Sequence, residues 1–142
     1  MRRSVHFLIA GSLTSLTSTA RADCLDDAAR YHRVNGMLIR AIAQQESGMR
    51  ANAVNMNSDG SEDIGLMQIN TSWLPKLARY RVTRESLFDA CVNAYVGTWI
   101  LASNIKHFGP TWKAVGAYNA VSTNKQLVYA NNIYRRLLRA QP

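Results

Sequence analysis

Apolar residues recur at helical spacing through most of the chain, and this periodicity predicts helices joined by short turns. The ranges that fit are 24–32, 37–47, 84–88, 90–108, 112–118 and 125–140, with a further short helix ending near Leu77. Alternating strand patterns are nearly absent, and no internal repeat or interdomain linker is visible. The sequence therefore predicts a mainly α, single-domain protein with about six helices and little or no sheet.

The longest helical pattern, 90–108, is predicted to be the central buried helix. Asp89 is a candidate N-cap, and Gly109 and Pro110 end the pattern. Gly97 indicates close packing against a neighbouring segment. The apolar stripe expected to face the core consists of Val92, Tyr95, Val96, Trp99, Ala102 and Ile105.

Three other polar residues are candidate helix caps, because their side chains can accept from the first free N–H groups of a helix. Asp23 precedes the first predicted helix, Thr83 precedes residues 84–88, and Thr111 precedes residues 112–118. In the last helix, the residues expected to face inward are Leu127, Ala130, Ile133, Tyr134 and Leu137.

Helical periodicity stops between residues 48 and 63, in the polar stretch GMRANAVNMNSDGSED. We interpret this stretch as a long loop. Loops longer than about 12 residues are uncommon inside compact domains and are often functional. It leads into Leu66, Met67 and Ile69, apolar residues that surround Gln68.

The second predicted helix carries a carboxylate on its apolar face. Ile39, Ile42, Ala43 and Glu46 fall at i, i+3, i+4 and i+7, so Glu46 points where the isoleucines point. Loss of hydration and the negative end of the helix dipole favour its protonated form, and Gly48 suits the end of the helix. Glu46 is either a general acid or a glutamate at the edge of the stripe with its carboxylate in water. Periodicity alone favours the second interpretation, because perturbed carboxylates also occur in structural networks.

The chain is basic, with a formal net charge of +8 over 142 residues, and its 47% hydrophobic content suits a single domain with one core. Without the first 22 residues, 14 basic residues would face nine acidic ones. A basic protein suits an anionic polymer such as a cell wall, a membrane surface or nucleic acid. No zinc-finger spacing or RNA-binding motif occurs, so we expect no nucleic-acid partner.

Residues 1–22 have the pattern of a secretory signal peptide. Two arginines precede an apolar run at 5–10, and the small-x-small triplet 20–22 predicts cleavage after Ala22. His6 interrupts the run, and the alternative is a disordered cytosolic N-terminus. No other stretch approaches the roughly 20 apolar residues of a membrane-spanning helix, so we expect an exported protein without stable membrane insertion.

The two cysteines, Cys24 and Cys91, both lie after the predicted cleavage point and can pair in an oxidising compartment. The alternative is two unrelated buried thiols. No motif indicates a cofactor or a metal, since no GxSxG elbow occurs and His32 and His107 are isolated in sequence.

Four motifs follow one another along the chain: AIAQQESG from Ala41, DIGLMQIN from Asp63, YVGTWIL from Tyr95 and VGAYNA from Val115. Together they resemble lytic transglycosylases with a goose-type-lysozyme-like catalytic domain. The chain is most similar to the small branch found with bacterial secretion and conjugation systems. The resemblance covers about residues 24–134, and it implies a lysozyme-like catalytic domain over residues 23–142 in the periplasm.

The resemblance also implies a site. Glu46 would be the only catalytic carboxylate, Gly65 to Gln68 would line a glycan groove, and Tyr118 would lie near Glu46. The substrate-binding residues that it implies are Ser47, Met67, Gln68, Tyr118 and Asn119. Met67 can also be an ordinary core residue, and Tyr118 a buried aromatic with a bonded hydroxyl. Relatives often have glycine where this chain has Val121, and valine resists the positive φ that glycine permits.

The implied reaction cleaves the β-1,4 bond between N-acetylmuramic acid and N-acetylglucosamine in peptidoglycan glycan strands. Glu46 would protonate the leaving oxygen and then remove the proton from the C6 hydroxyl of the sugar, which closes a 1,6-anhydro ring. Hydrolysis would need a second carboxylate, and the nearby candidates in sequence are Asp59, Glu62 and Asp63, to which the resemblance assigns no role.

The implied role is local wall opening by a monomer, with components of an envelope-spanning secretion or conjugation machine as partners. One alternative is a lysozyme-type hydrolase. The other is a non-catalytic wall-binding or DNA-binding accessory protein, for which the basic surface would matter and Glu46 would be incidental.

Overall fold

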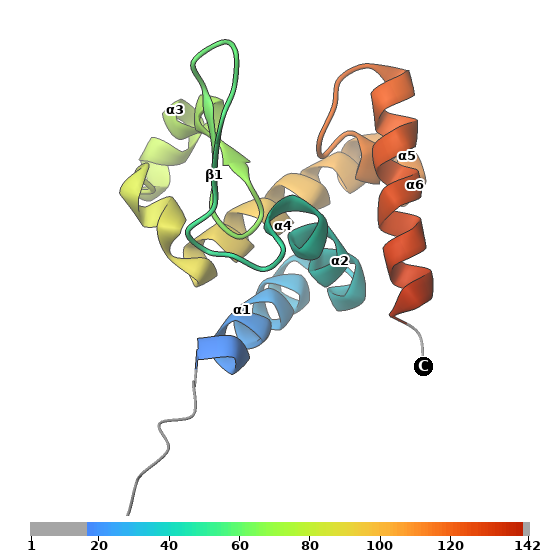
Figure 1. The fold of residues 1–142 in the computed structure, drawn as a ribbon, viewed down its shortest axis with the longest axis horizontal. Coiled ribbons are helices and arrows are strands. Elements are labelled where there is room, and N and C mark those ends of the chain that lie inside the picture. Colours follow the sequence, from blue (N-terminus) through green and yellow to red (C-terminus); the bar gives the residue numbers. More distant parts are fainter. Residues whose placement is uncertain (1–16, 141–142) are drawn as a thin grey trace, which may run out of the picture.

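The computed structural model describes residues 17–140, which form six α-helices and one small sheet. The helices are α1 (Thr17–His32), α2 (Gly36–Ser47), α3 (Leu74–Leu77), α4 (Ala90–Phe108), α5 (Trp112–Gly116) and α6 (Thr123–Arg139). Figure 1 shows the strands and α3 on one side of α2 and α4, with α5 and α6 on the other. The predicted mainly α fold with little sheet is confirmed.

The core lies where α1 and α2 meet α4 and α6, since α1 packs on α4 and α2 packs on α6. Leu25, Ile39, Ile42, Leu101 and Ile133 have no exposed surface there. Of the helices between residues 17 and 140, none combines the length and apolar character needed to cross a membrane.

The polar stretch at 48–63 is not a plain loop, so that interpretation was wrong. It contains β1 (Val54–Met56) and the start of β2 (Glu62–Ile64), which pairs in turn with β3 (Ile69–Asn70) in an antiparallel sheet of order β1-β2-β3. The turn between β1 and β2 is closed by the Asn57 and Ser61 backbones, with an N···O distance of 2.8 Å. All three residues of β1 are exposed. Backbone pairing rather than apolar burial holds this hairpin, which is why no hydrophobic alternation marked it.

The start of α1 also differs from the prediction. The helix begins at Thr17, so Asp23 lies inside it and is not an N-cap. No glycine or proline interrupts residues 17–23, and nothing in the sequence therefore stops the helix there. The predicted cleavage point after Ala22 falls within α1, and the apolar run at 5–10 lies outside the described residues.

Capping at the other helices follows the sequence in part. Asp89 is the N-cap of α4, because its side chain accepts from the backbone N–H groups of Cys91 and Val92. Thr111 occupies the N-cap position of α5 but makes no capping bond, and its hydroxyl donates to the Phe108 carbonyl instead. Residues Glu85–Phe88 form a 3-10 turn, η3, rather than an α-helix.

α4 is the buried central helix, but its inward face differs from the predicted stripe. Asn93, Ala94, Thr98 and Leu101 have no exposed surface, whereas Tyr95 is 37% exposed. α1, α5, β3 and η3 all pack against α4. Because several sides of the helix are covered, a single apolar stripe could not identify which residues are buried.

The inward face of α6 was also predicted with an error. Leu127 and Tyr134, expected inside, are 58% and 46% exposed, and Leu137 is half-buried. The residues of α6 that are buried are Gln126, Tyr129, Ala130 and Ile133. Gln126 and Tyr129 therefore face inward, whereas Leu127 and Tyr134, which the hydrophobic pattern places inside, face outward.

A buried amide on α4 fixes the segment between β2 and β3. Asn93 Nδ2 donates to the carbonyls of Ile64 and Leu87, both at 2.8 Å, and its Oδ1 accepts from the Met67 N–H at 2.7 Å. Gly65 passes so close, with φ +81°, that a Cβ there would lie 2.3 Å from Asn93 Nδ2. Only glycine fits this position.

The close packing predicted for Gly97 is confirmed. A Cβ on Gly97 would lie 2.5 Å from Met67 Sδ and 2.9 Å from Tyr118 Oη. Because Gly97 has no side chain, Met67 and Tyr118 can pack directly against the backbone of α4.

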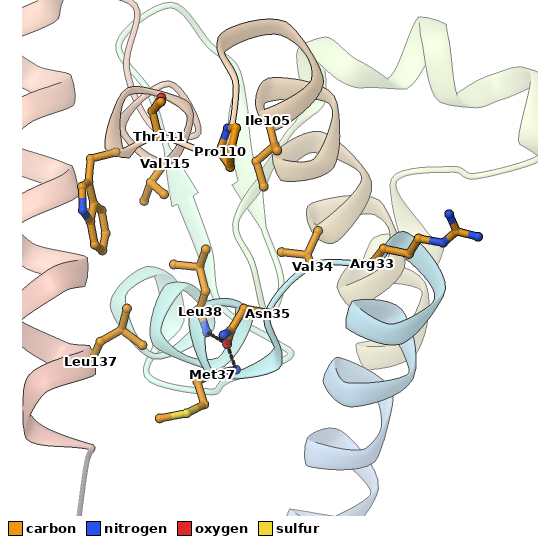
Figure 2. Close-up of a pocket in the computed structure, with 11 residues that line it drawn as sticks. Arg33, Val34, Asn35, Met37, Leu38, Ile105, Pro110, Thr111, Val115 and Leu137 are labelled. Atoms are coloured by element: carbon orange, nitrogen blue, oxygen red, sulfur yellow. Dashed lines mark hydrogen bonds between the residues drawn. The ribbon is translucent and has the colours of Figure 1, made fainter.

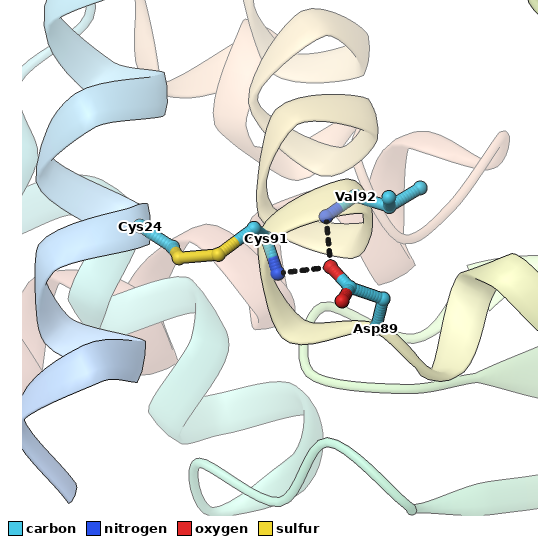
Figure 3. Close-up of a disulfide and its surroundings, with 4 residues drawn as sticks. All are labelled: Cys24, Asp89, Cys91 and Val92. Carbon is cyan, nitrogen blue, oxygen red and sulfur yellow. Dashed lines mark hydrogen bonds between the residues drawn. A yellow bond between two sulfur atoms is a disulfide. The ribbon is translucent and has the colours of Figure 1, made fainter. Parts of the chain in front are cut away.

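Cys24 on α1 and Cys91 on α4 form a disulfide, with Cα atoms 5.0 Å apart (Figure 3). We expect replacement of both cysteines by serine to lower the free energy of unfolding by about 4 kcal/mol, because the unfolded chain loses a long closed loop. Urea unfolding followed by circular dichroism measures the change. Reduced wild-type protein is the matched control and should behave like the variant, and an unchanged unfolding midpoint in both would contradict the expectation.

Gly97→Ala should displace Met67 or Tyr118 and lower the free energy of unfolding by about 1–3 kcal/mol. Thermal unfolding checks this. Ser103→Ala, at an exposed position of the same helix, is the control and should change stability by about 0.5 kcal/mol or less. Equal stability of the two variants would show that the contacts of Gly97 are not tight.

Candidate active site

Glu46 lies in the last turn of α2, on the wall of a groove. Asn35 caps the start of α2 by accepting from two backbone N–H groups, and Gly48 ends the helix in the left-handed conformation with φ 61°. Ile39 and Ile42, on the same face as Glu46, have no exposed surface. The helix therefore brings its carboxylate to the edge of the core, as its spacing predicted.

The groove has a volume of about 640 Å³ and takes its lining from the hairpin region, α4 and the segment after α5. A neighbouring cavity of about 390 Å³ continues along α6. Glu46 and Asn119 line both. Glu46 thus stands between two spaces, an arrangement that suits action on a bond within a chain-like ligand.

Burial raises the pKa of Glu46 to about 7. Removal of the carboxylate from water is the largest cause, and the negative charge of Asp63 adds to it. The hydrogen bond from Tyr129 acts in the opposite direction, because it stabilises the ionised form. A large fraction of Glu46 is therefore protonated near neutral pH and available as an acid.

Tyr129, which sequence reasoning missed, donates its hydroxyl to Glu46 Oε1. It comes from α6 and is buried. A second bond joins the same helices beside it, since Arg136 Nε donates to Gln45 Oε1 at 2.7 Å. The signal that could have found Tyr129 is the spacing of Gln126, Tyr129 and Ile133, which share one face of α6.

Tyr118 lies beside Tyr129, with their rings nearly parallel and the centroids 6.5 Å apart. Its hydroxyl donates to the Met67 carbonyl at 2.9 Å. Burial raises the pKa of both tyrosines, and the charge of Glu46 adds to this. Both hydroxyls are therefore neutral donors at the site.

Gln68 lines the groove in a strained backbone conformation, with φ 50°. Both polar atoms of its side-chain amide form hydrogen bonds. Nε2 donates to the Gly65 carbonyl at 3.0 Å, and Oε1 accepts from Asn55 Nδ2 at 2.6 Å. Gln68 is therefore held in one orientation at the groove wall.

Ser47 and Met67 lie behind the groove rather than in its lining. Ser47 is 3% exposed, and its hydroxyl donates to the Leu66 carbonyl at 2.7 Å and accepts from the Arg50 N–H at 3.0 Å. Met67 has no exposed surface. Both residues link the end of α2 and α4 to the segment that carries Gln68.

A second carboxylate, Asp63 on β2, lines the same groove as Glu46. Its two oxygens accept from Asn57 Nδ2 at 3.0 Å and from Asn70 Nδ2 at 2.8 Å. Of the other two acidic residues considered from sequence, Asp59 also lines the groove, whereas Glu62 forms an ion pair with Arg84. Sequence alone could not place these three residues, because the hairpin was not recognised.

Asn119 and Val121 lie in the segment after α5, and both have exposed side chains. Val121 lines the far part of the groove and does not have a positive φ. The backbone at Val121 therefore does not adopt the positive φ that favours glycine, and valine causes no strain there.

His32 and His107, the histidines among the described residues, do not line the groove. His32 packs against Tyr31 and Tyr95, and His107 packs against Phe108. In the part of the chain that the structure describes, no three His, Cys, Asp or Glu side chains gather in a way that could hold a metal ion.

Comparison with known sequences gives a consistent result. The Transglycosylase SLT domain family matches residues 23–134. The chain is 41% identical over 121 residues to "Invasion protein IagB" of Salmonella typhimurium (strain SL1344), covering 84% of this chain and 75% of that protein. It is 40% identical over 124 residues to "Protein IpgF" of Shigella flexneri, covering 84% and 82% respectively.

Among solved structures, an inactive mutant of lytic transglycosylase Slt from Pseudomonas aeruginosa has a similar fold. The TM-score is 0.69 with 18% sequence identity, over 86% of this chain and 24% of that one. At this identity the likeness concerns the fold. The chain belongs to the Transglycosylase SLT domain family, which confirms its predicted identification as a peptidoglycan lytic transglycosylase.

Proposed function

We propose that Glu46 cleaves the β-1,4 bond between N-acetylmuramic acid and N-acetylglucosamine, acting first as an acid and then as a base. The observation that carries this proposal is a buried carboxyl group with its pKa raised to about 7, located where the groove meets a second cavity. A glycan strand lying in both spaces would place one of its bonds beside Glu46.

In the first step, neutral Glu46 donates its proton to the glycosidic oxygen. The C1–O bond breaks as positive charge develops on the muramic acid ring. Tyr129 donates to Oε1, so the transferable proton belongs on the other carboxylate oxygen. The same hydrogen bond then stabilises the negative charge that Glu46 acquires.

In the second step, ionised Glu46 removes the proton from the C6 hydroxyl of the same sugar, whose oxygen forms a bond to C1. The product is a 1,6-anhydro ring, and Glu46 is protonated again for the next cycle. No water is consumed, so a single carboxyl group completes the reaction.

The remaining predicted residues divide into two groups by exposure. We assign Gln68, Tyr118 and Asn119, which line the groove, to substrate binding. Ser47 and Met67, which lie behind it, position the segment that carries Gln68 and do not touch the glycan. Tyr129 positions the Glu46 carboxyl group and adjusts its pKa.

Hydrolysis is the second candidate reaction, and Asp63 is the observation that favours it. Hydrolysis needs a second carboxylate that either attacks the sugar or activates water. Asp63 lines the groove, and its two oxygens accept hydrogen bonds from the side-chain amides of Asn57 and Asn70. The mass of the product separates the two reactions, because a hydrolysed end is heavier than an anhydro end by one water.

We further propose that the chain is exported, with residues 1–22 removed, and opens the wall locally for a secretion or conjugation machine in the periplasm. The motifs shared with the branch found with these systems support this role, as does a relative named for invasion. The basic character of the chain suits an anionic wall polymer.

Glu46→Gln is expected to abolish release of fragments from purified peptidoglycan, because glutamine can neither donate nor accept the required proton. Mass spectrometry of the wild-type products should show anhydro ends, and thermal unfolding should show that the variant is folded. Reducing ends would overturn the transglycosylase reaction in favour of hydrolysis. Full release by the variant would support the non-catalytic alternative.

The rate on soluble glycan oligomers should fall as the pH rises through about 7, because Glu46 must start protonated. Tyr129→Phe removes a bond that lowers the pKa of Glu46, so the alkaline limb of kcat/KM should move to higher pH. Asp63→Asn removes a charge that raises this pKa, so the limb should move to lower pH.

Tyr31→Phe, at an exposed position on α1, is the control for both variants and should keep the wild-type profile. For a variant whose activity is too low to assay, NMR titration of the Glu46 carboxyl group measures the pKa directly. Equal profiles or titrations in all four proteins would contradict the assigned roles of Tyr129 and Asp63.

A further inference from the structure

A separate cavity of about 540 Å³ lies between α2, the end of α4, α5 and α6. It shares no lining residue with the glycan groove. Figure 2 shows Leu38, Ile105, Val115 and Leu137 around it, and Trp112 also belongs to its lining. We call this space the outer cavity.

The outer cavity suits an apolar ligand better than a sugar. Its lining is mainly aliphatic and aromatic, and the guanidinium group of Arg33 at its edge points away from it (Figure 2). Asn35 Oδ1 accepts from two N–H groups at the start of α2, and the Thr111 hydroxyl donates to the Phe108 carbonyl. A sugar would leave hydroxyl groups without partners there, whereas a large apolar side chain would lose nothing.

Large apolar side chains also remain exposed along α6, whose Leu137 lines the outer cavity. Leu127, Tyr134 and Leu138 are 58%, 46% and 50% exposed, and their spacing of seven and four residues puts them along one stripe of α6. The ring of Trp112, itself 45% exposed, lies edge-on to Tyr134 with centroids 5.4 Å apart. Exposed apolar residues that are contiguous in this way mark interaction surfaces.

The charged residues of α4, α5 and α6 all have the same sign. Residues 90–140 contain six Lys and Arg residues and no Asp or Glu. Arg135 and Arg139 follow α6 one turn apart, next to the exposed stripe. A further cavity between α2 and α6 shares Met37 with the outer cavity and is lined by Arg139 and by Arg40, which forms an ion pair with Asp26.

We propose that α6, Trp112 and the outer cavity form a docking surface for an acidic amphipathic helix of a partner protein. Apolar side chains of that helix would enter the outer cavity and cover the stripe, while its carboxylates would face Arg135 and Arg139. The described part of this face consists of helices, so it offers no strand edge for an extended peptide. α6 has 17 residues, a length of about 25 Å, which matches about five turns of a partner helix.

The proposal does not depend on the reaction in the groove, so it can be tested with a synthetic probe. The probe is a labelled helical peptide of about 18 residues, with leucines at i, i+3, i+4 and i+7 flanked by glutamates. A matched peptide has lysine in place of every glutamate. Fluorescence anisotropy measures binding, and NMR of the Trp112 indole N–H locates it.

The acidic peptide should bind and shift the Trp112 signal. The double variant Arg135→Glu, Arg139→Glu should weaken binding about tenfold, and the lysine peptide should bind this variant better than it binds the wild type. Leu138→Ser should also weaken binding. The control variant Arg79→Glu, Arg81→Glu makes the same change of charge at exposed positions far along the chain, and should change affinity about twofold or less.

Each variant should cleave soluble glycan oligomers at the wild-type rate, which shows that it is folded and that the groove is intact. Equal losses in the test and control variants would overturn the proposal, since binding would then follow net charge alone. Absence of peptide binding would also overturn it. So would binding only to vesicles of phosphatidylglycerol and phosphatidylcholine, or self-association in sedimentation velocity that Leu138→Ser abolishes.

Discussion

The hydrogen bond from Tyr129 to Glu46 is the contact on which the site depends. It joins α6 to α2 across 83 residues of sequence, and its acceptor is a carboxyl group that the core keeps away from water. Burial makes the neutral acid accessible near neutral pH, and the tyrosine limits the size of that effect. The result is a group that can both give and take a proton, because neither form is strongly disfavoured.

Glu46 and Asp63, two of the carboxylates that line the groove, have different surroundings. Glu46 comes from the end of a helix packed into the core, with one hydroxyl as its donor. Asp63 comes from a polar hairpin and accepts from two amide groups. Apolar burial favours the neutral form of Glu46, and the hydrogen bond from Tyr129 favours its charged form. The hairpin therefore supplies polarity to the groove, and the helices supply the dry environment that the acid needs.

A few close contacts fix the position of the hairpin relative to the helices. Asn93 on the buried α4 satisfies two carbonyls and one N–H group of the hairpin side, and Gly65 leaves room for it. Gly97 lets Met67 and Tyr118 meet α4 at short distance. Asn93, Gly65 and Gly97 take no part in the reaction. Their contacts fix the positions of Gln68 and Tyr118 relative to Glu46.

Local sequence determined the parts that depend on neighbours along the chain. The helix of Glu46, its cap at Gly48, the Asp89 cap and the tight packing at Gly97 all follow from spacing or from a single residue type. The ordered motifs led to the family. Tertiary structure alone decided that Tyr129 faces Glu46, that Leu127 and Tyr134 face outward, and that Asp63 enters the groove. Each of these depends on which distant segment covers a given face, and hydrophobic periodicity carries no information about partners far away in sequence.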